Sequence, residues 1–273
     1  MNLDLLRDLT DAIAEADGAA PLDEGTWLAL RHHPERFVAV VEDDGYALLR
    51  GGEHLDLAVA PDHRRQGRGR QLATQVLDAA EGSVHAWSHV DHPGARRLAE
   101  DLGFERTREL WVMRLPHDVP LAPTDLEVRS FRPGDEKELL RVNAAAFAHH
   151  PEQGSLDLEG LQQRMAEAWW DPADLLVAEE DGRMLGFHWT KVHPAPAGEP
   201  PHGEVYVLGV DPGAQGRGLG KGLTLAGLAH LRERGVDQVL LYVEADNAPA
   251  VSLYRRVGFT HGARDTHVQY TRG

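Results

Sequence analysis

A glycine-rich segment in the second half of the chain has the residue types of a phosphate-binding turn. It reads Gln215-Gly-Arg-Gly-Leu-Gly-Lys221 and lies between an apolar run that predicts a strand and a long apolar stretch that predicts a helix. The first N–H groups of a helix are unpaired and its dipole favours an anion. Glycines admit a close ligand, and Arg217 adds a fixed positive charge. The segment predicts a pyrophosphate site, although a turn that only packs a helix on a sheet has the same composition.

The spacing of the glycines separates this turn from other phosphate loops. The chain has no G-x-x-x-x-G-K-[ST] pattern, so a P-loop is not supported. The segment does contain G-x-G-x-G, but half of the domain precedes its strand. That strand therefore cannot be the first of a βαβ nucleotide-binding fold.

The two halves of the chain repeat each other. The matched blocks are 55–72 with 205–223 and 91–104 with 246–259. Val59 matches Val210 and Phe104 matches Phe259, so the offset between the halves stays almost constant. Two matched blocks in the same order indicate a tandem duplication of one domain.

A proline-rich segment at 115–125 divides the two copies. It holds Pro116, Pro120 and Pro123 and shows no helical or strand period. Proline fixes φ and removes a backbone donor, so the segment predicts an extended linker. We expect a first domain at 1–115, a linker at 116–125 and a second domain at 126–273.

The hydrophobic periods predict an α/β fold with a mixed sheet in each half. In the second half the expected strands are 126–131, a hairpin at 175–189 around Asp181-Gly182, 204–210 and 239–244, and the expected helices are 135–148, 156–170, 216–234 and 247–257. The first half has the same order with a shorter front end and a hairpin at 37–49.

Composition limits the possible partners. The chain has 44 Asp+Glu against 28 Lys+Arg, a formal net charge of −16, which argues against a general nucleic-acid or anionic-membrane binder. It has no cysteine, which excludes disulfides, thiolate metal sites and a cysteine nucleophile. The N-terminal segment is too acidic for a signal peptide, and no apolar run approaches the ~20 residues that span a bilayer. We expect a cytoplasmic monomer.

The order of the motifs resembles the acyl-CoA-binding core of the GCN5-related N-acetyltransferase (GNAT) superfamily. The resemblance rests on two patterns, V-D-P-x-x-Q-G-R-G-L-G and N-x-x-A-x-x-L-Y-x-x-x-G-F. The resemblance implies that the turn holds the pyrophosphate of acetyl-CoA, the preceding strand binds the pantetheine and acetyl carbonyl, and the helix after Asn247 flanks the CoA arm. The implied contacts are Leu208, Gly209, Val210, Gln215, Gly216, Arg217, Gly218, Leu219, Gly220, Lys221, Asn247, Ala248, Pro249, Ala250, Val251 and Ser252.

Further blocks resemble the mycothiol synthase family, tandem GNAT enzymes of actinobacteria that acetylate the cysteinyl amine of Cys-GlcN-inositol. These blocks are 139–154, 167–172, 185–194 and 203–212. They cover most of the second half, whereas the first half matches mainly in layout and in its Arg-Arg-Gln-Gly-Arg-Gly turn. The resemblance implies acetyl-CoA and Cys-GlcN-Ins as substrates, with no metal.

Two residues of the second half are candidates for the proton transfers. Only a free amine attacks a thioester, and a carboxylate can remove its proton. Glu204, at the start of the strand that leads to the turn, is the first candidate. Asp211 is less suited because Asp-Pro after a strand is typical of a turn. Tyr254 matches the tyrosine that protonates the leaving thiolate in the family, although a tyrosine on an apolar helix face is commonly a core residue.

Further polar residues are candidate contacts to the sugar and inositol hydroxyls. They are Glu24, Glu167, Lys191, Glu204 and Tyr242. Glu24 has the alternative role of a helix-start residue, Glu167 that of an exposed carboxylate and Lys191 that of a solvated strand residue. The histidines do not have the spacing of a metal site, so we expect surface or hydrogen-bonded rings at His149, His150, His188 and His193.

The first half keeps the turn without the catalytic residues. Ala99 aligns with Tyr254, and nothing aligns cleanly with Glu204. We expect a catalytically silent copy that can still hold acetyl-CoA and that offers Glu24 to the substrate. Its implied acetyl-CoA contacts are Leu57, Ala58, Val59, Arg65, Gln66, Gly67, Arg68, Gly69 and Arg70.

Two other functions stay open at this point. The same fold can acetylate a different amine, such as an aminoglycoside, a polyamine or a protein N-terminus. Alternatively, the chain is a non-catalytic acyl-CoA-binding module.

Overall fold

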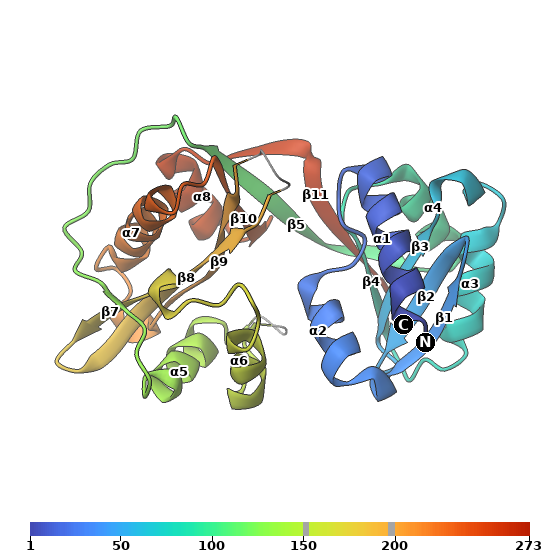
Figure 1. Cartoon of the computed structure of the whole chain (residues 1–273), viewed down its shortest axis with the longest axis horizontal. Coiled ribbons are helices and arrows are strands. Elements are labelled where there is room, and N and C mark those ends of the chain that lie inside the picture. The colour runs from blue at the N-terminus through green and yellow to red at the C-terminus, as the bar shows by residue number, and fades with distance from the viewer. Residues whose placement is uncertain (150–152, 196–199) are drawn as a thin grey trace. The chain divides into compact units, whose positions relative to one another are not determined.

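A computed structural model describes residues 1–149, 153–195 and 200–273, which form two compact units. The first unit consists of Met1–Trp111, Glu244–Asp246 and Gly262–Gly273, and the second of Val112–Val243 and Asn247–His261. In each unit, helices cover both faces of a sheet (Figure 1). His150 lies outside the described residues.

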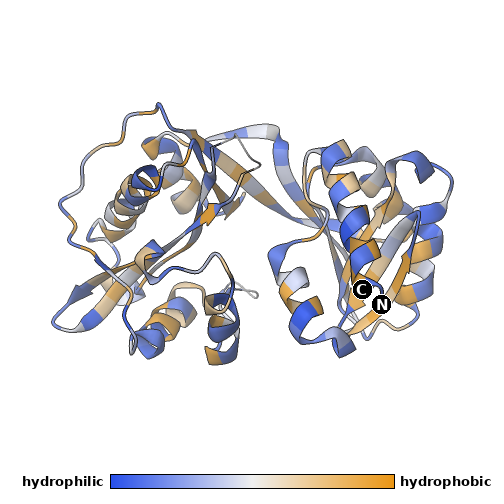
Figure 2. Cartoon of the chain, viewed as in Figure 1, coloured by the Kyte–Doolittle hydropathy of each residue, from blue (hydrophilic) through white to orange (hydrophobic). Residues whose placement is uncertain are grey.

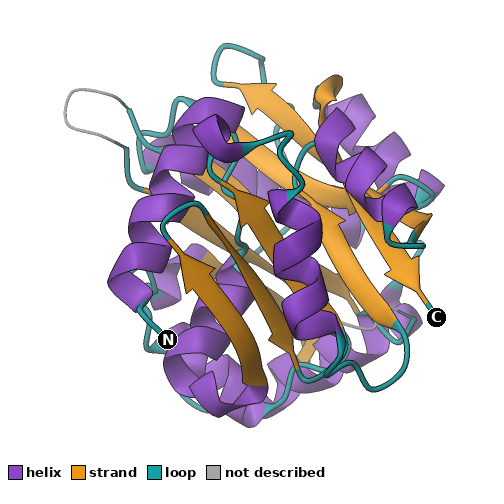
Figure 3. Ribbon diagram, turned by 90° about the vertical axis from the view of Figure 1, so that its right-hand side faces the viewer, coloured by secondary structure: helices purple, strands orange, loops and turns teal. Residues whose placement is uncertain are grey.

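The first unit places two helices on each face of its sheet. Helices α1 (Leu3–Asp17) and α2 (Glu24–His32) lie on one face, and α3 (Arg68–Leu77) and α4 (Pro93–Asp101) on the other (Figure 1). Figure 3 views this unit from its side, with the strands between the helices. The strands are β1 (Phe37–Glu42), β2 (Gly45–Arg50), β3 (His54–Val59), β4 (Val84–Ser88) and parts of β5 (Glu105–Pro116) and β11 (Thr260–Arg272), in the order β1-β2-β3-β4-β11-β5.

Helix α1 shows how local sequence sets these elements. The Asn2 side chain caps it by accepting the N–H of Leu5, and Gly18 ends it at φ +73°. Leu6, Leu9 and Ile13 are buried at helical spacing and pack against β2 in one core cluster. The helix therefore follows from its caps and one apolar stripe.

The second unit repeats this arrangement. Helices α5 (Glu136–Ala146) and α6 (Leu158–Met165) lie on one face of the sheet, and α7 (Leu219–Glu233) and α8 (Ala248–Val257) on the other (Figure 1). The strands carry both hydrophobic and hydrophilic residues in Figure 2. They are β6 (Arg129–Ser130), β7 (Leu175–Glu180), β8 (Arg183–His193), β9 (His202–Val210), β10 (Gln238–Glu244) and part of β5, in the order β5-β10-β9-β8-β7-β6.

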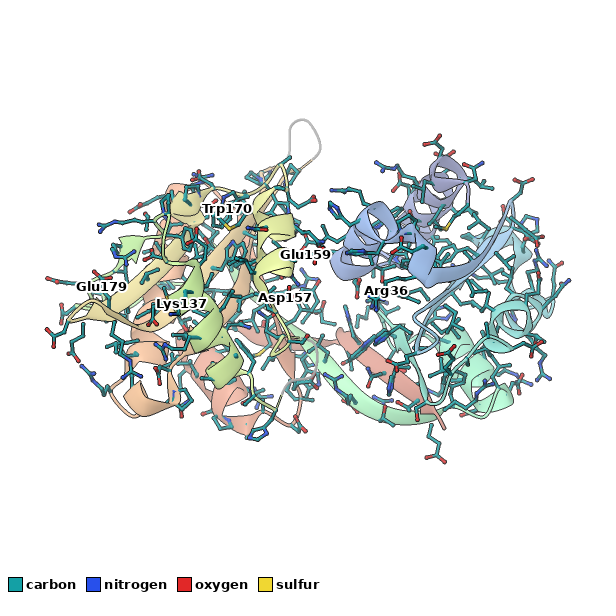
Figure 4. The ribbon with its side chains drawn as sticks, turned by 90° about the horizontal axis from the view of Figure 1, so that it is seen from below. Arg36, Lys137, Asp157, Glu159, Trp170 and Glu179 are labelled. Atoms are coloured by element: carbon teal, nitrogen blue, oxygen red, sulfur yellow. The ribbon has the colours of Figure 1, made fainter. Side chains whose placement is uncertain are left out.

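The structure confirms the mixed α/β fold and both hairpins. Several expected elements are shorter in the structure. The strand at 126–131 is only Arg129–Ser130, the helix at 156–170 is only Leu158–Met165, the helix at 216–234 is Leu219–Glu233, and the helix at 135–148 is Glu136–Ala146. After α6 the apolar pattern continues into Trp170, whose ring packs edge-on against Phe131 and Trp189 from a turn. Asp157 and Glu159 mark the start of this short helix (Figure 4).

The sequence analysis does not anticipate strand β5 or strand β11, and β11 joins residues from the two ends of the sequence. Its residues Val268–Arg272 pair antiparallel with Ser88–Val84 of β4, inside the first unit. The C-terminal residues thus complete a sheet built from the first half of the chain. Within the part of the chain that the structure describes, no helix has the length and apolarity of a membrane span.

Candidate functional site

Strands β9 and β10 pair along only part of their length. Their parallel register runs from His202 opposite Gln238 to Val205 opposite Leu241, whereas β9 continues to Val210. On its other side β9 stays paired with β8 through Val210. The β10-facing edge of β9 at 206–210 therefore has no paired strand in the described register. Such an edge offers backbone donors and acceptors to an extended ligand.

A bulge marks the point where this edge opens. The β8–β9 register shifts between Trp189 and Thr190, which face Val207 and Val205 and leave Tyr206 as the extra residue. An extra residue bends its strand and increases the local twist. The predicted contacts Leu208, Gly209 and Val210 all lie on the stretch of β9 that follows.

The glycine-rich turn follows this edge directly. Gly216 and Gly218 have φ of +79° and +80°, a conformation that favours glycine. A Cβ at either position would meet nothing within 4 Å, so backbone conformation rather than space requires these glycines. Helix α7 begins at Leu219 with no side-chain cap, which leaves its first N–H groups available to an anion.

The arginine of this turn has a protein partner in the structure. Arg217 donates from Nη1 and Nη2 to the Glu180 carboxylate at 3.0 and 2.7 Å. This contact lowers the pKa of Glu180. Both side chains are about half exposed, and exposed pairs contribute little to stability. A phosphate can therefore replace Glu180 as the partner of Arg217 at small cost.

Asp211 anchors the start of the turn. Its carboxylate accepts from Arg141 at 2.6 Å, from Arg183 at 2.9 Å and from the backbone N–H of Gly213 at 2.9 Å. These contacts, led by Arg141, lower the pKa of Asp211 to about 2. A carboxylate with so low a pKa is a poor general base, which agrees with the structural role expected for it.

Glu204 lies in a polar cluster on β8 and β9. It is 8 % exposed, and its Oε2 lies 2.6 Å from Nε2 of His193. The His193 ring stacks on that of His202, with centroids 4.6 Å apart and planes 6° apart. Burial, followed by the charge of His193, lowers the pKa of His202. The expectation of a hydrogen-bonded histidine at 193 is confirmed, but its partner is a candidate catalytic residue.

Lys191 faces Glu204 in the strand register and is 6 % exposed, so it is not a solvated residue. Its Nζ lies 4.2 Å from the ring centroid of Trp169 and 5.1 Å from that of Tyr206. Trp189 completes this aromatic group, 5.3 Å from Tyr206. Rings that surround a lysine in this way hold its charge by cation–π attraction.

The sequence analysis did not single out Trp169, Tyr206 or the His193 contact. The sequence signal that could have indicated the His193 contact was the alternation of side chains along a strand. Residues 191 and 193 share one face of β8, and 202 and 204 share the matching face of β9. Finding these contacts also required the register, which one sequence does not show.

Tyr254 and Asn247 belong to α8. Tyr254 is buried with its ring 5.7 Å from Phe259, and burial raises its pKa to about 12. The Asn247 side chain caps the helix by accepting the N–H of Ala250 at 3.2 Å. Residues 248–252 form the first turns of α8.

The remaining predicted contacts differ in exposure. Tyr242 on β10 is 45 % exposed. Glu167 is half-buried in the turns after α6, where its N–H donates to Arg164 O. Glu24 opens α2 directly after the cap Asp23, as in its alternative role of a helix-start residue.

Histidines outside this cluster hold the unit together. His188 is fully buried and its Nδ1 lies 2.8 Å from Leu223 O, which joins β8 to α7. Burial lowers its pKa to about 4. Among the described residues, no group of three or more His, Asp or Glu side chains could hold a metal.

The first unit contains a related edge and turn. The register of β3 with β4 covers only His54 and Leu55, whereas β3 continues to Val59. In the turn, Arg65 has φ +63° and Gly67 has φ +81°. Counted from Pro61 and Pro212, these two residues occupy the places of Gly216 and Gly218. The two Gln-Gly-Arg-Gly runs are therefore displaced by two residues in the structure.

Arginines of this first turn are also paired. Arg64 donates to Asp17 at 2.7 and 2.9 Å, and Arg68 pairs with Glu42 and Asp44. These pairs reduce the positive charge that the sequence assigns to the turn.

The comparisons with known proteins decide the family. A model of the acetyltransferase (GNAT) family matches residues 3–104 and 143–259. A mycothiol acetyltransferase of Nocardioides sp. is 56 % identical over 97 % of this chain and 98 % of its own length. The chain belongs to the mycothiol acetyltransferase family. Another mycothiol acetyltransferase, from Thermobispora bispora, is 48 % identical over 97 % of this chain and 94 % of its own length.

Solved structures agree with this family. A GCN5-related N-acetyltransferase from Sphaerobacter thermophilus is 25 % identical with a TM-score of 0.72, covering 98 % of this chain and 91 % of that one. A tandem GNAT protein from the clavulanic acid biosynthesis pathway is 20 % identical with a TM-score of 0.70, covering 98 % and 94 %. With the two segments matched by the family model, they confirm that this mycothiol acetyltransferase family member has a duplicated GNAT fold.

Proposed function

We propose that the protein transfers the acetyl group of acetyl-CoA to the cysteinyl amine of Cys-GlcN-inositol, which yields mycothiol and CoA. The similarity to the Nocardioides mycothiol acetyltransferase over almost the whole of both chains carries this substrate assignment. The open edge of β9, the turn before α7 and the buried Glu204 support the chemistry.

The second unit holds acetyl-CoA in this proposal. The edge at Leu208–Val210 hydrogen-bonds the pantetheine arm and the acetyl carbonyl. The N–H groups of Gly216–Lys221 receive the pyrophosphate, with Arg217 exchanging Glu180 for a phosphate oxygen. The first turns of α8 flank the arm.

The transfer needs three proton movements. Glu204 takes one proton from the ammonium group, the freed nitrogen pair attacks the acetyl carbonyl, and the C–S bond breaks to release CoA sulfur. Tyr254 gives its proton to the departing thiolate, and the nitrogen gives up its second proton as it becomes an amide, which restores the Tyr254 phenol. Because its pKa is raised to about 12, Tyr254 still carries this proton at neutral pH. No acyl-enzyme forms, in keeping with a chain without cysteine.

In this proposal the hydroxyls of the acceptor are bound by Lys191, Glu167, Tyr242 and Glu24.

The first unit holds a second acetyl-CoA through Leu57–Val59 and Arg65–Arg70 and performs no turnover. Calorimetric titration tests the latter point: two acetyl-CoA per chain are expected, and one per chain contradicts a second site.

The decisive assay is release of CoA from acetyl-CoA and Cys-GlcN-inositol by the wild-type protein. We expect turnover with this acceptor and little with aminoglycosides, polyamines or peptides. Activity only with another of these amines overturns the acceptor, and binding of acetyl-CoA without any turnover favours a binding module.

Glu204→Gln and Tyr254→Phe test the assigned roles. General acid or base groups typically contribute ~10²–10⁴-fold, so each change should lower kcat within that range. Acetyl-CoA affinity, measured by calorimetry, should stay within about twofold because neither group binds the CoA arm. Unchanged turnover in either variant contradicts its role.

A further inference from the structure

The hydrogen bond between His193 and Glu204 crosses two paired strands. The register places His193 opposite His202 and Lys191 opposite Glu204, so the His193–Glu204 contact is diagonal. The side chains are 28 % and 10 % exposed, and the distance between Nε2 and Oε2 is 2.6 Å. A contact this short between half-buried and buried groups orients both side chains.

The chemistry of the two groups decides which atom carries the proton. An ionised carboxylate has acceptors only, so Nε2 of His193 must be the donor and its Nδ1 is left without a proton when the ring is neutral. His202 is stacked flat against His193 and limits rotation of the ring. One oxygen of Glu204 is thereby fixed, and Oε1 remains for another partner.

We propose that His193 is a positioning residue for Glu204, whose Oε2 it holds so that Oε1 receives the proton of the acceptor amine. This inference rests on the proposed function. In the step, the ammonium N–H bond breaks, an Oε1–H bond forms and the electron pair stays on nitrogen. His193 keeps its Nε2–H throughout, so no proton passes through the ring.

The charge of His193 then controls the base. A protonated His193 forms an ion pair with Glu204 and makes the carboxylate a weaker proton acceptor. Among the residues that the structure describes, the other charged or titratable groups around the pair are Lys191 on β8, His202 on β9 and Arg114 on β5. The rate should therefore be lower wherever His193 carries a second proton.

A second histidine–carboxylate pair in the same unit provides the matched control. His230 on α7 lies 2.6 Å from Oδ1 of Asp174, through the same ring nitrogen. Asp174 also lies 3.4 Å from Arg234 and precedes β7. This pair joins a helix to the strand layer and has no role in the proposed reaction.

The test compares wild type, His193→Ala, His193→Gln and His230→Ala from pH 5.5 to 9. We measure kcat, the KM for each substrate and the melting temperature. His193→Ala should lower kcat roughly tenfold or more, part of the ~10²–10⁴-fold that general-base catalysis supplies, with the KM for acetyl-CoA within about twofold. The glutamine amide can donate a hydrogen bond from near the position of Nε2, so His193→Gln should recover most of kcat. Because glutamine cannot gain a proton, kcat of this variant should no longer fall at acid pH. His230→Ala should lower the melting temperature and leave the pH profile of kcat unchanged.

The inference is overturned if His193→Ala has the same pH profile and kcat as the wild type. It is also overturned if the kcat of His193→Gln is no higher than that of His193→Ala. Imidazole ¹⁵N spectra give a readout that needs no turnover. The neutral His193 ring should be the Nε2–H tautomer, and Glu204→Ala should convert it to a mixture. Any other tautomer, or no change in Glu204→Ala, also overturns the inference. Failure of the proposed function shows separately, as absence of wild-type turnover with Cys-GlcN-inositol.

Discussion

Two buried carboxylates of the second unit show how hydrogen-bond partners distinguish a general base from a structural residue. Asp211 accepts from two arginines and a backbone N–H, which stabilise its charged form. Glu204 accepts from one histidine and faces Lys191 across the strands. Asp211 thus has little affinity for a proton, whereas Glu204 keeps an oxygen for the acceptor. The sequence favoured Glu204 over Asp211 from their positions on the strand and in the turn, and the partners of the two carboxylates give the physical reason.

The low pKa of Asp211 predicts a pH-dependent stability. The folded-state pKa of about 2 lies below the ordinary aspartate value of 3.8. The Asp211 carboxylate therefore stabilises the fold above the unfolded-state pKa, and this stabilisation is lost as pH falls from about 4 to about 2. We expect the loss to be roughly 1–2 kcal/mol, since Arg183 is exposed and solvent screens its charge. Urea unfolding of wild type and Asp211→Asn at pH 2 to 7 measures it. Parallel stability curves for the two proteins would contradict the prediction.

At the scale of elements, glycines serve two distinct purposes. Gly216 and Gly218 supply left-handed backbone at the entrance to α7. Gly227, further along α7, supplies space, because a Cβ there would lie 2.1 Å from Nδ1 of His188. Helix α7 can approach β8 closely enough for the contact between His188 and Leu223 only because that side chain is absent.

Gly227→Ala should therefore destabilise the second unit despite the better helix propensity of alanine. Overpacking of this kind typically costs ~1–3 kcal/mol, and His188 is fully buried with little room to move. Gly220→Ala in the same helix is the control, since its Cβ would meet only Leu253 at an ordinary 3.8 Å. Urea unfolding should give a lower stability for Gly227→Ala and an equal or higher stability for Gly220→Ala. Equal stabilities of Gly227→Ala and wild type would show that His188 moves aside freely.

At the scale of the whole molecule, sequence halves and compact units do not coincide. Residues Gly262–Gly273 belong to the first unit, and Val268 and Tyr270 of β11 are buried in a core cluster with Leu49, Leu72 and Phe104. The stability of the first unit thus depends on the last residues of the chain.

Val268→Ala should weaken the first unit selectively. Val268 is fully buried, and removing part of a buried aliphatic side chain costs roughly 1–3 kcal/mol. Hydrogen exchange should become faster in β2–β4 and stay unchanged in β7 and β8. Leu231→Ala in α7, which is equally buried in the second unit, should give the reverse pattern. Equal acceleration in both units would mean that they unfold as one cooperative body.

The sequence alone determined the features that depend on neighbouring residues. Hairpin turns, the glycine-rich turns and the duplicated order of motifs are local patterns, so they could be identified before any fold was known. Only the tertiary structure decided that β11 joins β4, that Lys191 lies among aromatic rings and that His193 meets Glu204. Strand register and the β9 bulge determine these contacts, because a shift of one residue turns every side chain of a strand to the other face.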